Sequence, residues 1–177
     1  MISSKQFFDL WVEKYEKNKK PLSLNWDDRK KYTIEIKKVC DDLAKELNLD
    51  TWHEYYSSDT IFYKKDNAEI IGGSTYIINP EIVFEHENEA NNFLSEIAHN
   101  LIIKSKLYVT VSYYKSTPDI NYLNKIKDLI NKSSSSNEFK KNKNFLLIIG
   151  DDREYQSKNY WKGYIFHKKK WLLVDSH

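Results

Sequence analysis

Cysteine, long apolar runs and a surplus of one charge are what this sequence lacks most clearly. A single cysteine, Cys40, excludes an internal disulfide framework, and its place in a helical pattern predicts a small buried residue. No apolar run approaches the roughly 20 residues that span a bilayer. Charged residues interrupt the first segment, MISSKQFFDLWVEKYEK, too early for a signal peptide. We therefore expect a soluble protein of the reducing cytoplasm, with no membrane partner.

The sequence also lacks the signatures of several common chemistries. The formal net charge of +2 gives no global indication of nucleic-acid binding, and short basic clusters such as 17–20 are typical of solvated turns. The histidines show no ligand spacing with cysteine or with one another, which argues against a structural zinc. No Gly-rich phosphate loop, nucleophile elbow or Ser/His/Asp arrangement is found. Nucleotide hydrolysis and acyl transfer are therefore unsupported.

What the sequence does contain predicts one α/β domain over residues 1–177. Its 177 residues suit one well-buried domain, and 40% hydrophobic and 15% aromatic residues are globular values. We expect an N-terminal helical segment over 1–25, a core over 27–114, and a C-terminal helix with strands over 115–177. The fold class is a central mixed β-sheet flanked by helices on both faces.

The first half of the chain reads as helices followed by a β meander. One helix begins at Ser3 or Ser4 and ends at NKKP, where Pro21 is the expected stop. A second helix opens at Asp27–Asp28 and runs to about Leu47. Strands are then expected over 52–56 and 60–63 and, with a bend at the two glycines, over 69–78.

The segment from 82 to 114 predicts a βαβ unit. A strand at Ile82–Glu87 leads into a helix from Asn88 to about Lys104, and LYVTVSYY at Leu107–Tyr114 reads as a strand buried on both faces. Such a crossover implies a parallel pair. A helix from Thr117–Pro118, a strand over 145–149 and a hairpin over 160–167 and 171–175 complete the chain. We expect the strands at 82, 107 and 145 in the middle of the sheet.

Two carboxylates end the strand IVFEHEN. Alternation places Glu85 and Glu87 on one face, with Ile82, Phe84 and His86 on the other, where His86 is expected to face a helix or the core. An unpaired charge near a dry core costs several kcal/mol, so it is normally neutralised, paired or bound to metal. The alternative is that the strand frays into solvent at Glu85.

Other acidic residues compete for a place beside this pair. Asp59 opens a strand, and Glu46 lies on the margin of its helix's apolar stripe, where it either leans over the sheet edge or is solvated. Glu81 shares the face of Glu85 but lies about 13 Å away along the strand, too far to share one small cation. Asp66 falls in a turn. On the helix after Asn88, Glu96 points off the apolar stripe.

Together these segments resemble the PD-(D/E)xK nuclease superfamily, the restriction-endonuclease-like fold. The series is a helix with a Glu near its end, Asp59 opening a strand, the EHE of 85–87 closing the next major strand, a helix and a buried strand. EIVFEHEN and EIAHNLIIKSKLYVTVSYY carry the resemblance, which covers roughly 27 to 114. Ser58 stands where the family has proline, and Glu87 replaces the motif lysine, as in the family's E-x-E variant.

The resemblance implies a metal-dependent nuclease that hydrolyses phosphodiester bonds in DNA. Asp59 and Glu85 would bind Mg²⁺ or Mn²⁺, Glu87 would complete or assist the site, and Glu46 would match the helical Glu that some members contribute. Mg²⁺ is hard, keeps several waters and takes one or two carboxylates, and it lowers the pKa of a bound water. A restriction or defence endodeoxyribonuclease, a homodimer if it cuts both strands, is the resulting hypothesis.

The competing hypothesis is a non-catalytic binding protein on a similar fold, such as an immunity protein that neutralises a toxin. Small size, near-neutral charge and the degenerate motif favour it. So do aromatic residues expected to be exposed, such as Tyr160 and Trp161, because aromatic side chains are enriched at protein interfaces. Aromatic side chains also stack on bases, so they do not separate the two hypotheses.

Overall fold

The structure is a computed structural model that describes residues 2–88, 93–114, 120–133, 144–151 and 160–174. Its helices are α1 (Ser4–Lys17), α2 (Lys19–Leu24), α3 (Arg29–Leu47), α4 (Phe93–Asn100) and α5 (Ile120–Lys132), with a 3-10 turn, η1 (Lys65–Asn67). Its strands are β1 (Asp50–Tyr55), β2 (Ser58–Tyr63), β3 (Ala68–Ile71), β4 (Ser74–Ile77), β5 (Ile82–Glu87), β6 (Leu107–Tyr114), β7 (Phe145–Asp151), β8 (Trp161–His167) and β9 (Lys170–Val174).

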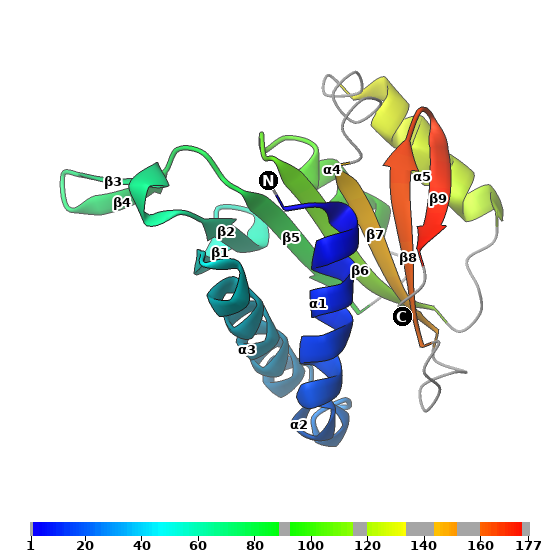
Figure 1. Ribbon diagram of the computed structural model, residues 1–177, viewed down its shortest axis with the longest axis horizontal. Coiled ribbons are helices and arrows are strands. Elements are labelled where there is room, and N and C mark those ends of the chain that lie inside the picture. Colours follow the sequence, from blue (N-terminus) through cyan, green and yellow to red (C-terminus); the bar gives the residue numbers. More distant parts are fainter. Residues whose placement is uncertain (1, 89–92, 115–119, 134–143, 152–159, 175–177) are drawn as a thin grey trace.

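Seven strands form one mixed sheet in the order β1-β2-β5-β6-β7-β8-β9 (Figure 1). The pairs β5/β6 and β6/β7 are parallel, and the other neighbours are antiparallel. The three apolar strands therefore lie in the middle of the sheet, as predicted. They lie there because helices cover both of their faces, and only a doubly covered strand buries apolar side chains on both sides.

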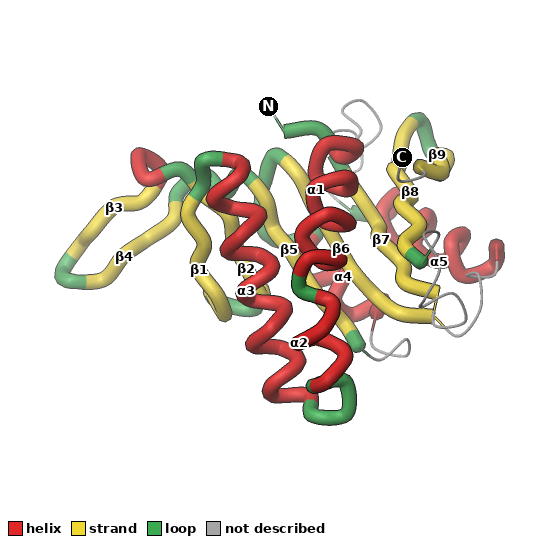
Figure 2. Tube along the Cα trace, turned by 60° about the horizontal axis from the view of Figure 1, so that its bottom comes forward, coloured by secondary structure: helices red, strands yellow, loops and turns green. Residues whose placement is uncertain are grey.

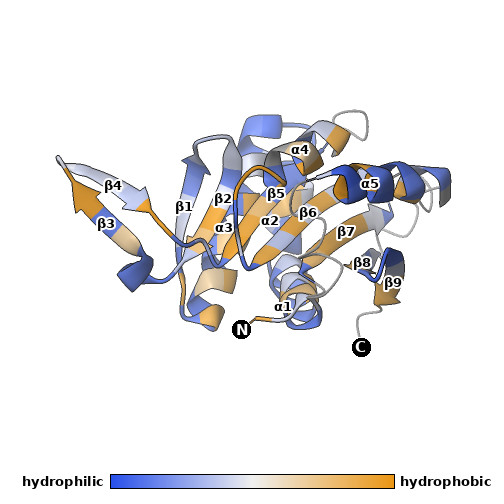
Figure 3. Cartoon of the chain, turned by 90° about the horizontal axis from the view of Figure 1, so that it is seen from above, coloured by the Kyte–Doolittle hydropathy of each residue, from blue (hydrophilic) through white to orange (hydrophobic). Residues whose placement is uncertain are grey.

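Helices lie over both faces of the sheet and enclose two hydrophobic cores (Figure 3). Helices α1 and α3 cover a face rich in aromatic side chains, which includes Trp11, Tyr15, Phe62 and Phe84. Helices α4 and α5 cover the opposite face, where residues such as Ile97, Ile126, Tyr108 and Leu147 pack together. The predicted α/β architecture is confirmed at this level.

Local signals place the helix ends of the first half. Ser3 Oγ accepts from the backbone N–H of Gln6, and an Asp28 oxygen accepts from that of Lys31, which caps α1 and α3. Pro21 was expected to stop the first helix, but it lies within the first turn of α2. A proline is tolerated there because the first backbone N–H groups of a helix have no intrahelical partner.

Two further expectations differ from the structure. Helix α4 ends at Asn100 and not near Lys104, because residues 101–103 form a turn that leads to β6. Tyr160 and Trp161 are buried and not exposed: Trp161 packs edge-on against Tyr15, with ring centroids 4.7 Å apart. Residues 89–92, 115–119 and 134–143 lie outside the described part of the chain. They include the first turn of the helix predicted after Asn88, the helix start predicted at Thr117–Pro118 and most of the loop predicted over 132–138.

A two-stranded ribbon, β3 and β4, projects from the body beside β1 (Figures 1 and 2). Its tip is Gly72–Gly73, both at positive φ (60° and 82°), which suits glycine. A strand or a hairpin with a bend at the two glycines was expected over 69–78, and the structure contains the hairpin. Among the described helices, none is both long and apolar enough to cross a lipid bilayer.

Candidate metal-binding site at the strand ends

Asp59 and Glu85 face each other across the antiparallel pair of β2 and β5. The regular pairing of Thr60 with Phe84 is the last before them, and beyond it the two side chains hold the strands together. The backbone N–H of Asp59 donates to Glu85 Oε2 at 3.2 Å, and that of His86 donates to Asp59 Oδ2 at 2.8 Å. Each carboxyl group is thus fixed by the other strand's backbone.

One oxygen of this pair has no hydrogen-bond partner. Glu85 is 1% exposed, and its Oε1 is buried and accepts no hydrogen bond from the described residues. Leaving a buried acceptor unsatisfied costs about 1–3 kcal/mol, and more if it is charged. The hydroxyl of Ser58, which is also buried and makes no hydrogen bond of standard geometry among the described residues, lies close enough to lower the pKa of Glu85 and is placed to donate to this carboxyl group. No lysine or arginine among the described residues donates to Glu85 Oε1.

Burial and mutual repulsion raise the pKa values of Asp59 and Glu85 and so favour their protonated forms. Desolvation raises the pKa of Glu85 to about 9, and the charge of Asp59 adds to that rise. Desolvation also raises the pKa of Asp59, although the hydrogen bond from the His86 N–H opposes the rise. Burial and the nearby charge of Asp59 therefore favour the protonated form of Glu85 in the apo pair at neutral pH.

Helix α4 brings further polar groups to the same sheet face. The charge of Glu96, in its first turn, contributes to the raised pKa values of both Asp59 and Glu85. Asn100 donates from Nδ2 to Thr110 Oγ1 at 3.0 Å, and Thr110 is the β6 neighbour of Glu85. Asn100 is fully buried, and its Oδ1 has no hydrogen-bond partner among the described residues.

Glu96 and Asn100 were not predicted from the sequence as site residues. The available signal was the position of Glu96 off the apolar stripe of the helix that follows Glu85. In a βαβ unit that helix packs on the strand it leaves, so a polar residue in its first turn lies near the carboxyl end of that strand.

Behind the pair, on the α1/α3 face, His86 joins a chain of buried hydroxyl groups. His86 Nε2 lies 2.8 Å from Tyr113 Oη, Tyr113 Oη lies 2.6 Å from Tyr32 Oη, and Tyr15 Oη lies 3.4 Å further along. Burial lowers the pKa of His86 to about 3, so the imidazole is neutral. His86 was expected to face the core, and this is confirmed. Its ring anchors the backbone whose N–H holds Asp59.

Glu87 and Glu81 lie at opposite ends of the same strand. Glu87, the last residue of β5, is half-buried two residues beyond Glu85. Glu81 precedes the strand, is buried, and pairs with Lys106 Nζ at 2.6 Å. Glu81 is therefore a structural ion-pair member, while Glu87 remains near the carboxyl pair.

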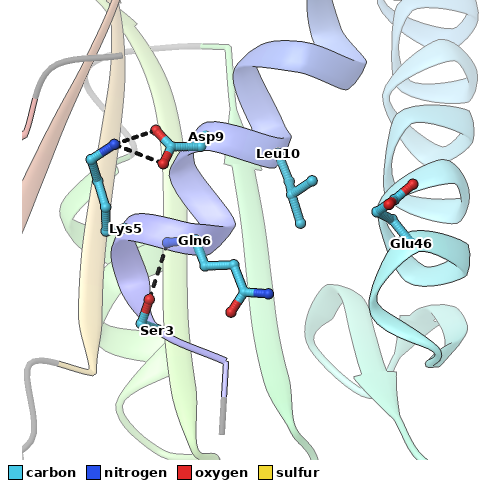
Figure 4. A pocket seen from close by; sticks show the side chains of 6 residues that line it. All are labelled: Ser3, Lys5, Gln6, Asp9, Leu10 and Glu46. Atoms are coloured by element: carbon cyan, nitrogen blue, oxygen red, sulfur yellow. Dashed lines mark hydrogen bonds and ion pairs between the residues drawn. The ribbon is translucent and has the colours of Figure 1, made fainter. Parts of the chain in front are cut away.

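The structure does not bring Glu46 to this pair. Glu46 lies where α3 faces α1, beside a hollow of about 480 Å³ that is lined by residues of α1 and its cap (Figure 4). Its Oε2 accepts from Lys14 Nζ at 3.1 Å. Because α1 and α3 cover the opposite sheet face, Glu46 supports helix packing and not the site of Asp59 and Glu85.

The donor set suits a hard cation that keeps much of its water. Among the residues that the structure describes, no three His, Cys, Asp or Glu side chains are grouped as a ready-made metal site. Mg²⁺ usually takes only one or two carboxylates and completes its octahedron with water and substrate oxygens. The unsatisfied, buried Glu85 Oε1 and the carboxyl oxygens of Asp59 fit that requirement.

Comparison with protein-family models, with curated proteins and with solved structures found no match for this chain.

Proposed function

We propose that the protein is a cytoplasmic, Mg²⁺- or Mn²⁺-dependent endonuclease that acts on DNA. The observation that carries the proposal is a desolvated carboxyl pair fixed across two strands, in which one buried Glu85 oxygen makes no hydrogen bond of standard geometry with the described residues. Buried carboxyl groups left in this state are common at sites that bind metal or move protons.

The arrangement of elements supports a restriction-endonuclease-like core. Helix α3, strands β1, β2 and β5, helix α4 and strand β6 occur in that order, and the four strands are consecutive in the sheet. Asp59 and Glu85 lie at the edge formed by the carboxyl ends of the parallel strands, where ligands of open α/β sheets bind.

Each residue has a definable role in this proposal. Asp59 and Glu85 would hold the cation, which would supply an activated water and stabilise charge on the phosphate. The His86 N–H keeps Asp59 oriented. Glu87, at the strand end, is placed to hold or orient a water at the rim of the site. Glu96 adds negative charge that favours a divalent cation over a monovalent one.

Cleavage of supercoiled plasmid with millimolar Mg²⁺ or Mn²⁺ tests the proposal. We expect Asp59→Asn and Glu85→Gln each to reduce the cleavage rate by about 100-fold or more. Each replaces a negatively charged carboxylate that would bind the metal with a neutral amide of nearly the same shape. Glu46→Gln is the matched control, because its carboxylate pairs with Lys14 on the other face. It should cleave at the wild-type rate.

Two results would contradict the proposal. One is a wild-type protein that cleaves neither plasmid nor single-stranded DNA with either metal. The other is cleavage that persists in Asp59→Asn, which would mean a contaminating or different active site. The first result would favour the non-catalytic binding protein.

A further inference from the structure

The β3–β4 ribbon and the adjoining end of β1 expose an unusual number of large apolar side chains. Ile70 is 78% exposed and Tyr56 79% exposed. We call the following set the ribbon patch: Trp52, Tyr56, Ile70, Ile71, Tyr76 and Ile78. Figure 3 shows the hydrophobic colour of β3 on the projecting arm.

Tyr55 joins the aromatic residues of β1 to the root of the ribbon. The Tyr55 ring contacts those of Trp52 and Tyr56, with centroids 5.4 and 4.7 Å apart, and Tyr55 Oη accepts from the backbone N–H of Ile77 at 3.0 Å. The β1 aromatic residues and the root of the ribbon therefore form one surface with a projecting arm.

A ribbon of this kind is poorly stabilised alone. The register pairs Ile70 with Thr75 and Ile71 with Ser74, so successive isoleucines lie on opposite faces of two strands with no third strand. Isolated two-stranded hairpins are at best marginally stable in water. Covering the arm would stabilise it.

From this surface we propose that the ribbon patch is the interface of a two-fold symmetric homodimer. One chain carries both a projecting apolar arm and an aromatic strip at the base of that arm. A two-fold axis brings the arm of each copy onto the strip of the other, so a single patch supplies both halves of a closed interface.

Size and charge favour a second copy of the chain over nucleic acid. The six side chains lie on both faces of the arm and on the strip at its base, so a partner that encloses the arm would cover all of them. Their exposed surface is on the order of 600 Å², which approaches the roughly 800 Å² per partner of a standard interface. The charges around the ribbon, Lys64, Lys65, Asp66 and Glu69, cancel, whereas DNA-binding surfaces are basic. The inference does not depend on the metal site.

Sedimentation velocity of the full chain over a wide concentration range tests the dimer. We expect a species of twice the 21.2 kDa monomer mass at high concentration. The double variant Ile70→Asp/Ile71→Asp should weaken dimerisation at least tenfold, because it places charges in the interface. The matched control is Ile102→Asp, since Ile102 is 81% exposed but lies outside the patch. It should dimerise like the wild type.

A second variant guards against misfolding of the ribbon. Tyr56 has φ 54°, a conformation that asparagine adopts readily, so Tyr56→Asn removes the ring with little backbone strain. It should also weaken the dimer while circular dichroism stays unchanged. A wild-type monomer at all concentrations would overturn the proposal. So would a dimer insensitive to both variants, or a ribbon patch occupied by a different protein or by DNA. Plasmid cleavage by such a monomer would leave the metal site standing.

Discussion

At the scale of single residues, the site consists of two desolvated carboxyl groups close to a third acidic side chain, Glu96. Glu85 is buried beside Asp59, and Glu96 adds repulsion. Backbone N–H groups hold the two carboxyl groups, and within the described part of the chain no lysine or arginine is hydrogen-bonded to them. A carboxyl pair in such surroundings is stabilised either by a shared proton or by a cation. The protonated pair and the cation-bound pair differ in how the free energy of unfolding depends on pH.

Replacing Glu85 tests the apo state. Folded Glu85 keeps its proton up to a pH of about 9, whereas the unfolded chain loses it above about 4.5, so rising pH favours unfolding within that window. Glu85→Gln removes this linkage. We expect the variant to match the wild type near pH 5 and to be about 2–4 kcal/mol more stable near pH 8. Urea unfolding without metal across this range measures the difference.

Glu81→Gln is the matched comparison, since Glu81 flanks the same strand but pairs with Lys106. It should lose stability or be neutral, never gain. A Glu85→Gln protein that is less stable than the wild type at pH 8 would show that Glu85 anchors a structural interaction.

The sequence located Asp59 and Glu85 but could not rank the helical acids. Glu46 lies at the margin of the apolar stripe of its helix and Glu96 lies off the stripe of its own, and what decides which of them is near the site is the sheet face that each helix covers. That depends on the path of the whole chain. A local pattern does not contain it, so Glu46 was expected near the site while Glu96 was overlooked.

At the scale of elements, β7 packs tightly against the aromatic groups behind the site. A Cβ added at Gly150 would lie 2.9 Å from both Tyr113 Cδ1 and Tyr160 Cζ. Gly150→Ala should therefore force these rings apart and cost about 1–3 kcal/mol of unfolding free energy. Thermal or chemical unfolding measures the loss.

Gly73→Ala provides the contrast for that prediction. Nothing lies within 4 Å of the added Cβ there, and only the positive φ of 82° opposes it. A cost of about 1 kcal/mol is expected from backbone strain alone. If Gly150→Ala were harmless, the rings would be free to move, and the rigid support inferred for His86 through Tyr113 would be wrong.

The positions of the central strands were predicted correctly from the sequence, whereas the burial of side chains toward the edge of the sheet was not. The apolar runs of β5, β6 and β7 require cover on both faces, so their central position followed from the sequence. Tyr160 and Trp161 follow a polar stretch and were expected to be exposed. They are buried because β8 pairs with β7 and because α1, distant in the chain, packs over that face.

At the scale of the whole molecule, metal binding would couple to stability. A ligand that binds only the folded state at about 100 times its dissociation constant adds roughly 2.7 kcal/mol, which for a chain of this size corresponds to a melting-temperature rise of about 5–10 °C. We expect Mg²⁺ or Mn²⁺ to produce such a rise in the wild type. Calorimetry at matched ionic strength detects it.

The same calorimetry on variants locates the effect. Asp59→Asn should show no rise, while Glu46→Gln should keep the full rise. Because binding must displace the proton of Glu85, the effect should grow with pH up to about 9. A rise equal in all three proteins would indicate metal bound elsewhere.

The most direct measurement is an anomalous difference map from crystals soaked in Mn²⁺. If Asp59 and Glu85 hold the cation, the map should show a manganese peak about 2.0–2.3 Å from carboxyl oxygens of both residues, with waters in the remaining coordination positions. An empty pair, with Glu85 Oε1 hydrogen-bonded to a protein donor and manganese only at other sites, would contradict it.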